Sequence, residues 1–257
     1  MWCKIMSLTK DFVKISGELF EYLFPEGIPR NSFIIIAGKG GSGKSVFLIS
    51  IVKSLLNRGE PVLYMALDDD PKTVIQQISA LNFNVVDYVK KGLFFIVDGY
   101  SYRIRGEHRK MHVSVIAEVD PQNMQHTINT VITILDENKF IDRGVLVIDS
   151  LNEFLSHYKQ EELVEYVKDM RANISKARGI TILASLHTST QVAKDMLNYV
   201  EHCVDGVIIA RRSSLAETQT SFKILIKRMK GVRHQQGWVH YALDEYRELK
   251  ILHKVTK

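Results

Sequence analysis

The sequence lacks the features that staple small secreted proteins or anchor proteins in membranes. It has two cysteines, Cys3 and Cys203, whose separation fits neither a disulfide framework nor a metal-binding spacing. No uncharged apolar run approaches the roughly 18 residues of a membrane-spanning helix. The first residues also lack the apolar core of a signal peptide. We therefore expect a cytoplasmic protein with reduced thiols and no membrane partner.

Linkers, internal repeats and low-complexity tracts are missing as well. Prolines number five in 257 residues, and no Pro/Gly/Ser-rich stretch divides the chain. With 257 residues, 46% hydrophobic and 25% charged, the chain can bury a sizeable core without disulfides or structural metals. We expect one domain over residues 1–257, with residues 1–32 as a lead-in segment.

The charge balance is mildly basic and uneven. The formal net charge of +5 is compatible with a nucleic-acid partner, although many enzymes share it. The nine histidines are scattered and predict no zinc site. The basic residues gather in two segments: Arg103, Arg105, Arg109 and Lys110, and Lys223, Lys227, Arg228, Lys230, Arg233 and His234.

Short apolar runs alternate with helical patterns. The predicted strands are 33–37, 62–67, 93–97, 145–148, 180–184 and 207–210. The predicted helices are 45–57, one from Pro71 behind the cap Asp70, one from Pro121 behind Asp120, and 163–177. Uniformly apolar strands between helices indicate a parallel sheet covered on both faces. After residue 205 alternating segments predict antiparallel strands added near the C-terminus. We therefore expect an α/β fold, and the stretch 100–120 carries no predicted structure.

A glycine-rich phosphate-binding loop follows the first predicted core strand. Gly38, Gly43, Lys44 and Ser45 satisfy G-x-x-x-x-G-K-[ST] between a buried strand and a helix. The glycines let backbone N–H groups converge on phosphate oxygens. Lys44 is placed to reach the β- and γ-phosphates, and Ser45 to offer its hydroxyl to Mg²⁺. We expect ATP and Mg²⁺ as cofactors, held by Gly38, Lys39, Gly40, Gly41, Ser42, Gly43, Lys44, Ser45 and Val46.

Acidic residues end two of the predicted strands. The run from Gly144 to Asp149 has the Walker B pattern, in which Asp149 joins Ser45 in holding the metal. Asp68, Asp69 and Asp70 close the second strand, where strand ends form the ligand crevice of an open sheet. Asp68 or Asp69 is a candidate to activate the attacking water, whereas Asp70 reads as a helix cap.

These motifs resemble the KaiC-like branch of the RecA-superfamily ATPases, in the single-domain form common in archaea. The segment from Glu26 to Ser32 is similar to the family's G-G-I-P-R-G-S lead-in, and Asp68-Asp69 stands where the family has a Glu-Glu pair. Arg228-Met229-Lys230-Gly231-x-x-His234 is similar to its K-M-R-G-x-x-H motif. The resemblance implies a RecA-like fold and ring hexamers with ATP between subunits.

The resemblance also implies roles for individual residues. Lys44, Asp68 and Asp69 would act within one subunit, and Arg228 and Lys230 would reach the neighbour's γ-phosphate, with His234 in the same nucleotide contact. Two departures stand out: aspartate replaces both glutamates, which shortens their reach, and Arg228 and Lys230 exchange the family's Lys and Arg. Hydrolysis is therefore expected to be slow.

Other functions stay open at the level of the sequence. The favoured hypothesis is a Mg²⁺-dependent, ring-forming ATPase that couples nucleotide state to a regulatory or signalling partner. The alternatives are a slow nucleotide-sensing scaffold and a recombinase paralogue acting on DNA, although no aromatic–basic alternation typical of a single-strand groove occurs. Lys39 and Asp68-Asp69-Asp70-Pro71 also resemble the ParA/MinD-like ATPases, but here a long lead-in precedes the loop and Asp149 is followed by Ser150-Leu151-Asn152.

Overall fold

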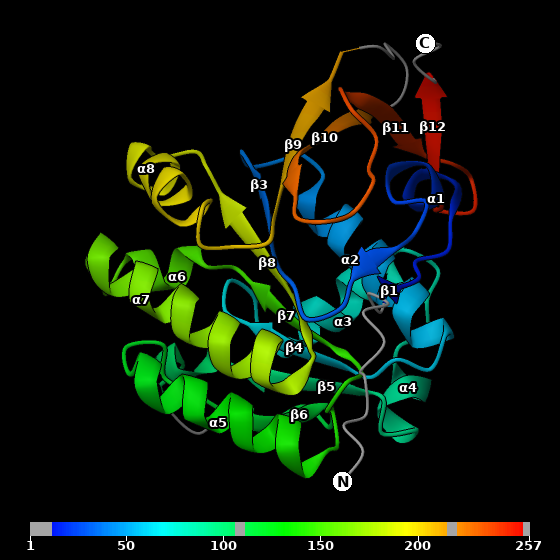
Figure 1. The fold of residues 1–257 in the computed structure, drawn as a ribbon. Coiled ribbons are helices and arrows are strands. Elements are labelled where there is room, and N and C mark those ends of the chain that lie inside the picture. Colours follow the sequence, from blue (N-terminus) through cyan, green and yellow to red (C-terminus); the bar gives the residue numbers. More distant parts are fainter. Residues whose placement is uncertain (1–11, 106–110, 215–219, 254–257) are drawn as a thin grey trace, which may run out of the picture.

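The computed structural model describes residues 12–105, 111–214 and 220–253. Its centre is a ten-stranded sheet in the order β12-β11-β10-β9-β3-β8-β7-β4-β5-β6 (Figure 1). The strands are β3 (Phe33–Gly38), β4 (Val62–Ala66), β5 (Phe94–Asp98), β6 (Val115–Glu118), β7 (Val145–Asp149), β8 (Thr181–His187), β9 (Gly206–Ser213), β10 (Ser221–Met229), β11 (Val239–Leu243) and β12 (Leu249–His253). Strands β3 to β9 pair in parallel, and β10, β11 and β12 are antiparallel additions. The predicted α/β class, with its antiparallel strands near the C-terminus, is confirmed.

Helices cover both faces of the sheet (Figure 1). One face packs against α1 (Glu18–Leu23), α2 (Lys44–Asn57), α3 (Pro71–Ser79) and α4 (Val86–Lys90). The other packs against α5 (Met124–Glu137), α6 (Asn152–Leu155), α7 (Gln160–Met170) and α8 (Gln191–Val200). A π-helix, η2 (Arg171–Lys176), continues α7, and a short 3-10 turn, η1 (Ser101–Arg103), follows β5. None of the described helices combines the length and apolar character needed to cross a membrane.

The central strand β3 explains why the core strands are uniformly apolar. Its six residues are all buried, with Ile34 and Ile36 in the core beneath α2, and Phe33 and Ile35 in the core beneath α7. Because successive side chains of a strand point to opposite faces, a strand covered on both faces needs apolar residues throughout. This packing places the loop after Gly38 at the sheet edge formed by the carboxyl ends of the parallel strands.

The segment before β3 forms a small attachment. Here β1 (Phe12–Val13) pairs with β2 (Ile28–Pro29), and α1 buries Leu19, Phe20 and Leu23. Arg30 forms an ion pair of 2.8 Å with Glu60 at the end of the loop after α2. The Glu26–Ser32 lead-in motif is thereby fixed to the body of the sheet.

Some predicted boundaries were wrong. Asp120 accepts backbone bonds within a turn, and α5 begins at Met124 with Asn123 as its cap. The predicted helix over 163–177 ends as α-helix at Met170 and continues as η2. Strand β8 extends to His187, three residues beyond its predicted end, and β6 and β12 were not predicted. Cys3, Arg109 and Lys110 lie outside the described residues.

Candidate functional site

The glycine-rich loop joins β3 to α2 in a conformation that needs its glycines. Gly43 has a left-handed φ of 86°, and a side chain there would meet the Phe222 ring at 2.6 Å. At Gly38 an added Cβ would lie 2.3 Å from the carbonyl oxygen of Ala210 on β9. Both glycines are therefore required by close packing against the strands on that side. The turn also aims the N-terminus of α2 at the loop's interior, where it favours an anion.

Lys44 occupies the interior of this loop. Its ammonium donates hydrogen bonds of 2.9 Å to the carbonyl oxygens of Gly38 and Lys39, and the residue is 3% exposed. Burial lowers the pKa of Lys44 to about 8, although Asp149 and Asp68 favour its charged form. A desolvated cation with carbonyl partners gains strongly from a bound anion, because charge-assisted hydrogen bonds are about twice as strong as neutral ones.

Asp149 is the last residue of β7, which pairs with β4 on one side and with β8 on the other. Its carboxylate accepts hydrogen bonds of 2.5 Å from the hydroxyls of Tyr64 and Ser185. Burial raises the pKa of Asp149, and these two hydrogen bonds counter the effect in part. Asp149 is thus held in one orientation by the strands on either side of it.

Asp68 follows β4 and faces the end of β8. Its carboxylate accepts a hydrogen bond of 2.7 Å from the Ser150 hydroxyl and lies 3.2 Å from His187 Nε2. Burial alone would raise the pKa of Asp68, but the hydrogen bonds from His187 and Ser150 outweigh it, so the pKa lies below its ordinary value. The Asn152 side chain fixes His187 by accepting from its backbone N–H at 2.6 Å and donating to its carbonyl at 2.9 Å.

The other two acids of the triplet point elsewhere. Asp69 accepts a hydrogen bond of 2.8 Å from the Gln77 side chain on α3. Asp70 accepts from the backbone N–H groups of Lys72 and Thr73, as its predicted capping role requires. Of the three acids, Asp68 is therefore the one whose charge acts on Lys44.

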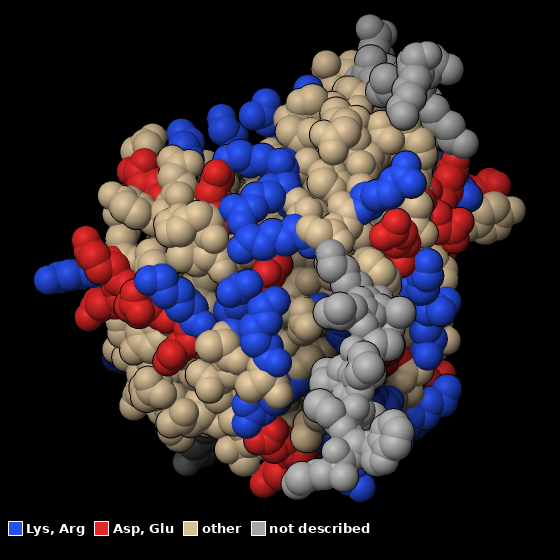
Figure 2. All heavy atoms as spheres, viewed as in Figure 1, with Lys and Arg blue, Asp and Glu red and all other residues tan. Residues whose placement is uncertain are grey.

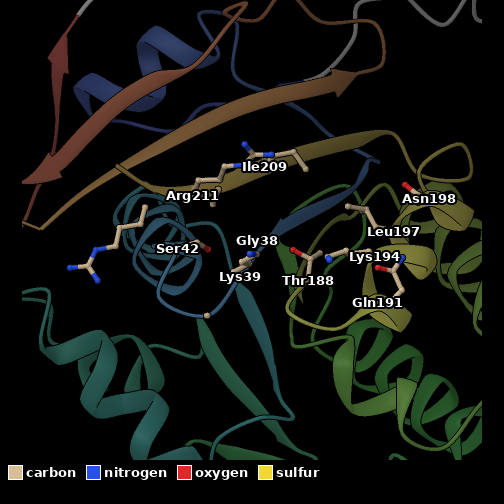
Figure 3. Close-up of a pocket in the computed structure, with 13 residues that line it drawn as sticks. Gly38, Lys39, Ser42, Thr188, Gln191, Lys194, Leu197, Asn198, Ile209 and Arg211 are labelled. Carbon is tan, nitrogen blue, oxygen red and sulfur yellow. The ribbon is translucent and has the colours of Figure 1, made fainter. Parts of the chain in front are cut away.

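A hollow of about 790 Å³ opens beside the loop. Figure 3 shows its walls, which come from the phosphate loop, the loop before α8, α8 itself and β9. Its volume lies within the range of small-molecule sites. Its basic residues are Lys39, Lys194, Arg211 and Arg212.

Three residues of the predicted site lie at the opposite edge of the sheet. Near the end of β10, Met229 pairs with Gly206, which in turn pairs with Ile34 at the start of β3. Arg228 and Lys230 flank Met229 there, and His234 follows in the next turn, where its Nδ1 lies 3.2 Å from the Val232 carbonyl. Along β3, the four residue steps from Ile34 to Gly38, about 13 Å, separate the level of Met229 from the phosphate loop of the same chain.

Local contacts hold the basic residues of this edge. Arg228 donates a hydrogen bond of 2.8 Å to the Glu201 carbonyl, and Lys227 forms an ion pair with the Glu201 carboxylate. Burial, together with Arg228 and other nearby cations, lowers the pKa of Lys230 against the opposing effect of Asp205.

The sequence did not point to Tyr64, Ser185 or His187. Tyr64 lies inside an apolar run and reads as a core residue. Ser185 and His187 fall beyond the predicted end of their strand at residue 184. The available signal was that Ser185 and His187 interrupt the apolar run of β8 near its carboxyl end, where strand ends form the ligand crevice.

Comparisons with known proteins agree with this geometry. A family profile described as the KaiC ATPase matches residues 13–255. The chain belongs to the KaiC ATPase family. UPF0273 proteins of Thermotoga maritima and Aeropyrum pernix are each 26% identical to it over 211 residues, covering 81% of this chain and 82% and 80% of theirs.

A longer relative and a solved structure point to the same family and fold. The circadian clock protein KaiC3 of Synechocystis is 20% identical over 238 residues, which are 91% of this chain and 44% of that longer protein. The crystal structure of a KaiC-like protein from Pyrococcus horikoshii superposes with a TM-score of 0.73 at 17% identity, covering 94% of this chain and 99% of that one. The RecA-like fold predicted for this KaiC-family chain is thereby confirmed, and the resemblance to ParA/MinD-like ATPases is not favoured.

Proposed function

We propose that this KaiC-family protein binds ATP with Mg²⁺ at the phosphate loop and hydrolyses it slowly. The observation that carries the proposal is the buried ammonium of Lys44, held between loop carbonyls and within the field of Asp68 and Asp149. Phosphate oxygens would replace the carbonyl partners of Lys44 and stabilise its charge. The loop glycines and the start of α2 would supply backbone N–H groups to the same phosphates.

The donor set suits Mg²⁺. Ser45 and Asp149 offer the hydroxyl and carboxylate oxygens that this ion prefers, and the Ser45 hydroxyl has no hydrogen-bond partner among the residues described. Since both Asp149 oxygens already accept hydrogen bonds, we expect Asp149 to act on the ion's water shell. Ser45 and Asp149 would hold the ion, whose charge would offset that of the phosphates.

Asp68 is our candidate for the water-activating acid. It is ionised, faces Lys44, and is oriented by Ser150 and His187. A water beside the γ-phosphate could donate a proton to it, and His187 would stabilise the carboxylate in place. The aspartate side chain is one methylene shorter than the family's glutamate, which supports slow turnover and keeps a nucleotide-sensing scaffold as the second candidate.

We further propose that subunits form a ring, with a hexamer favoured, in which Arg228 and Lys230 act on the neighbour's γ-phosphate and His234 joins that contact. Their place at the end of the sheet opposite the phosphate loop supports this, because they project from the side away from the nucleotide site of their own chain. A regulatory or signalling protein would sense the nucleotide state of the assembly in the cytoplasm. Residues 1–257 would act as a single domain in this assembly.

The test compares two lysines of one loop. Lys44→Ala should weaken ATP binding by about tenfold to a hundredfold or more in calorimetric titration, because the loss of such a charge-assisted contact costs roughly 1.5–3 kcal/mol or more. Lys39→Ala is the matched control: it keeps the backbone that Lys39 contributes to the loop and removes only an exposed side chain, so we expect ATP to bind normally. Near-parental affinity in folded Lys44→Ala would refute the site. Loss of turnover in Lys39→Ala, with binding retained, would instead favour the ParA/MinD-like alternative.

A further inference from the structure

The antiparallel part of the sheet has one face that no described helix covers completely. Phe222, Ile224 and Tyr241 point into the core beneath α1 and α2. The opposite face of these strands carries Arg211, which is exposed, together with partly exposed Lys223. Figure 2 shows Lys and Arg side chains gathered between α8 and β9. This face also continues into the basic hollow beside the phosphate loop, because Arg211 belongs to both.

An aromatic ring lies among these cations. The Arg211 guanidinium is 4.9 Å from the centre of the Trp238 ring, and the Lys223 ammonium is 5.2 Å from it. Arg211 and Lys223 are opposite each other in the β9–β10 register, where like charges repel. The partly exposed indole at the start of β11 therefore holds two cations that would otherwise separate.

These cations differ from others on the surface. Lys53, Lys168 and Arg178 each form an ion pair of 2.6 to 2.7 Å with a carboxylate. Within residues 12–105, 111–214 and 220–253, no carboxylate lies within ion-pair distance of the basic residues on this face. These residues are Lys194, Arg211 and Lys223, together with Lys39 in the adjoining hollow. An unneutralised basic strip of this kind favours an external polyanion.

We propose that this face, defined by Lys194, Arg211, Lys223 and Trp238, binds single-stranded nucleic acid. The cations would follow the phosphates, and a base would stack on the Trp238 ring in place of Arg211 or Lys223, which move to phosphate oxygens. A duplex fits less well, because its bases are already stacked. None of these side chains is placed to select a sugar, so DNA and RNA should bind equally. The proposal does not depend on ATP hydrolysis.

The sequence offers a direct probe, since it has two tryptophans. In a Trp2→Phe background, Trp238 becomes the sole indole, and its emission reports base stacking. Titration with oligothymidylate and oligouridylate of about 12 nucleotides should quench it equally and saturably. Trp238→Ala should weaken binding of a labelled oligonucleotide about fivefold or more. Arg211→Gln combined with Lys223→Gln should reduce the slope of log K against log salt by about 1.4, or 0.7 for each lost phosphate contact.

Two controls separate this face from other sources of binding. Lys168→Gln removes a paired cation on α7 and should leave affinity and salt slope unchanged. Lys44→Ala should still bind oligonucleotide, so that failure of the ATP site and failure of this face are distinguishable. The proposal is overturned by absence of quenching at low salt, by loss of quenching in Lys44→Ala, or by competition from ATP at equal phosphate concentration. Equal quenching by heparin, which has no bases, would also overturn it.

Discussion

The buried ammonium of Lys44 should make the affinity of the proposed site for ATP depend on pH. Its pKa lies at about 8 in the unliganded protein, and bound phosphates would favour the charged form. Binding therefore takes up a proton above that pKa, and affinity falls as the pH rises through it. We expect ATP to bind about tenfold more weakly at pH 9 than at pH 7.

Calorimetry in buffers of different ionisation enthalpy would count the protons taken up. Lys44→Arg is the matched control, since a guanidinium stays charged over this range and should remove the dependence even if it weakens binding. A pH-independent affinity in the parent protein would contradict the role given to Lys44.

The acids Asp68 and Asp69 differ in their partners, and so should their variants. Asp68→Asn should keep ATP affinity but lower single-turnover hydrolysis at least about tenfold, because an amide cannot accept a proton. Asp69→Asn should have a much smaller effect, since Asp69 is bonded to Gln77 on α3. Equal losses in the two variants would mean that the acids share the role, as the sequence alone allowed.

Sequence reasoning at this scale found residues that share a local motif and missed those joined by strand register. Gly38 to Ser45 form one continuous loop, so spacing was enough. Tyr64 and Ser185 meet Asp149 because β4, β7 and β8 pair with a particular register, in which Ala66 lies opposite Asp149 and Ile148 opposite Ala184. No spacing in the chain encodes that meeting.

At the scale of elements, strongly patterned segments were predictable and edges were not. The buried strands β3, β4 and β7 were predicted to within about one residue. The short edge strand β6 and the final strand β12 were missed, because an edge strand need not be uniformly apolar. Asp120-Pro121 carries a helix-start signal that a turn uses equally well, and the turn prevails here.

That competition between turn and cap can be measured. Asn123 accepts from the His126 backbone N–H at the start of α5, so Asn123→Ala should lower the free energy of unfolding by about 1 kcal/mol. Asp120→Ala should cost less, since its partner is the Gln122 N–H within the turn. Urea denaturation of both variants decides between them. A larger cost for Asp120→Ala would mean that Asp120 stabilises α5 more than its cap does.

At the scale of the molecule, the two halves of the predicted site lie on opposite edges of one sheet. The phosphate loop follows the carboxyl end of β3, whereas Arg228 and Lys230 lie level with its amino end, with β9 between them. In a head-to-tail contact, the end of the sheet that carries Arg228 and Lys230 in one subunit meets the phosphate loop of the next. Such contacts close into a ring when the rotation between subunits allows it. The geometry within one chain thus favours action between subunits.

Mixed assemblies test this arrangement. Lys44→Ala and Arg228→Ala should each be inactive alone, the first without ATP and the second with ATP bound but not hydrolysed. When the two variants are mixed in equal amounts, half of the subunits carry an intact loop and half of their neighbours carry an intact Arg228. About a quarter of the interfaces therefore join the two, and about a quarter of the parental turnover should return. It should fall on dilution, as assembly does. Arg178→Ala, whose arginine pairs with Asp136 elsewhere, should need no such rescue. If mixed assemblies confirmed by mass stay inactive at every ratio, Arg228 does not act on the neighbouring subunit's nucleotide.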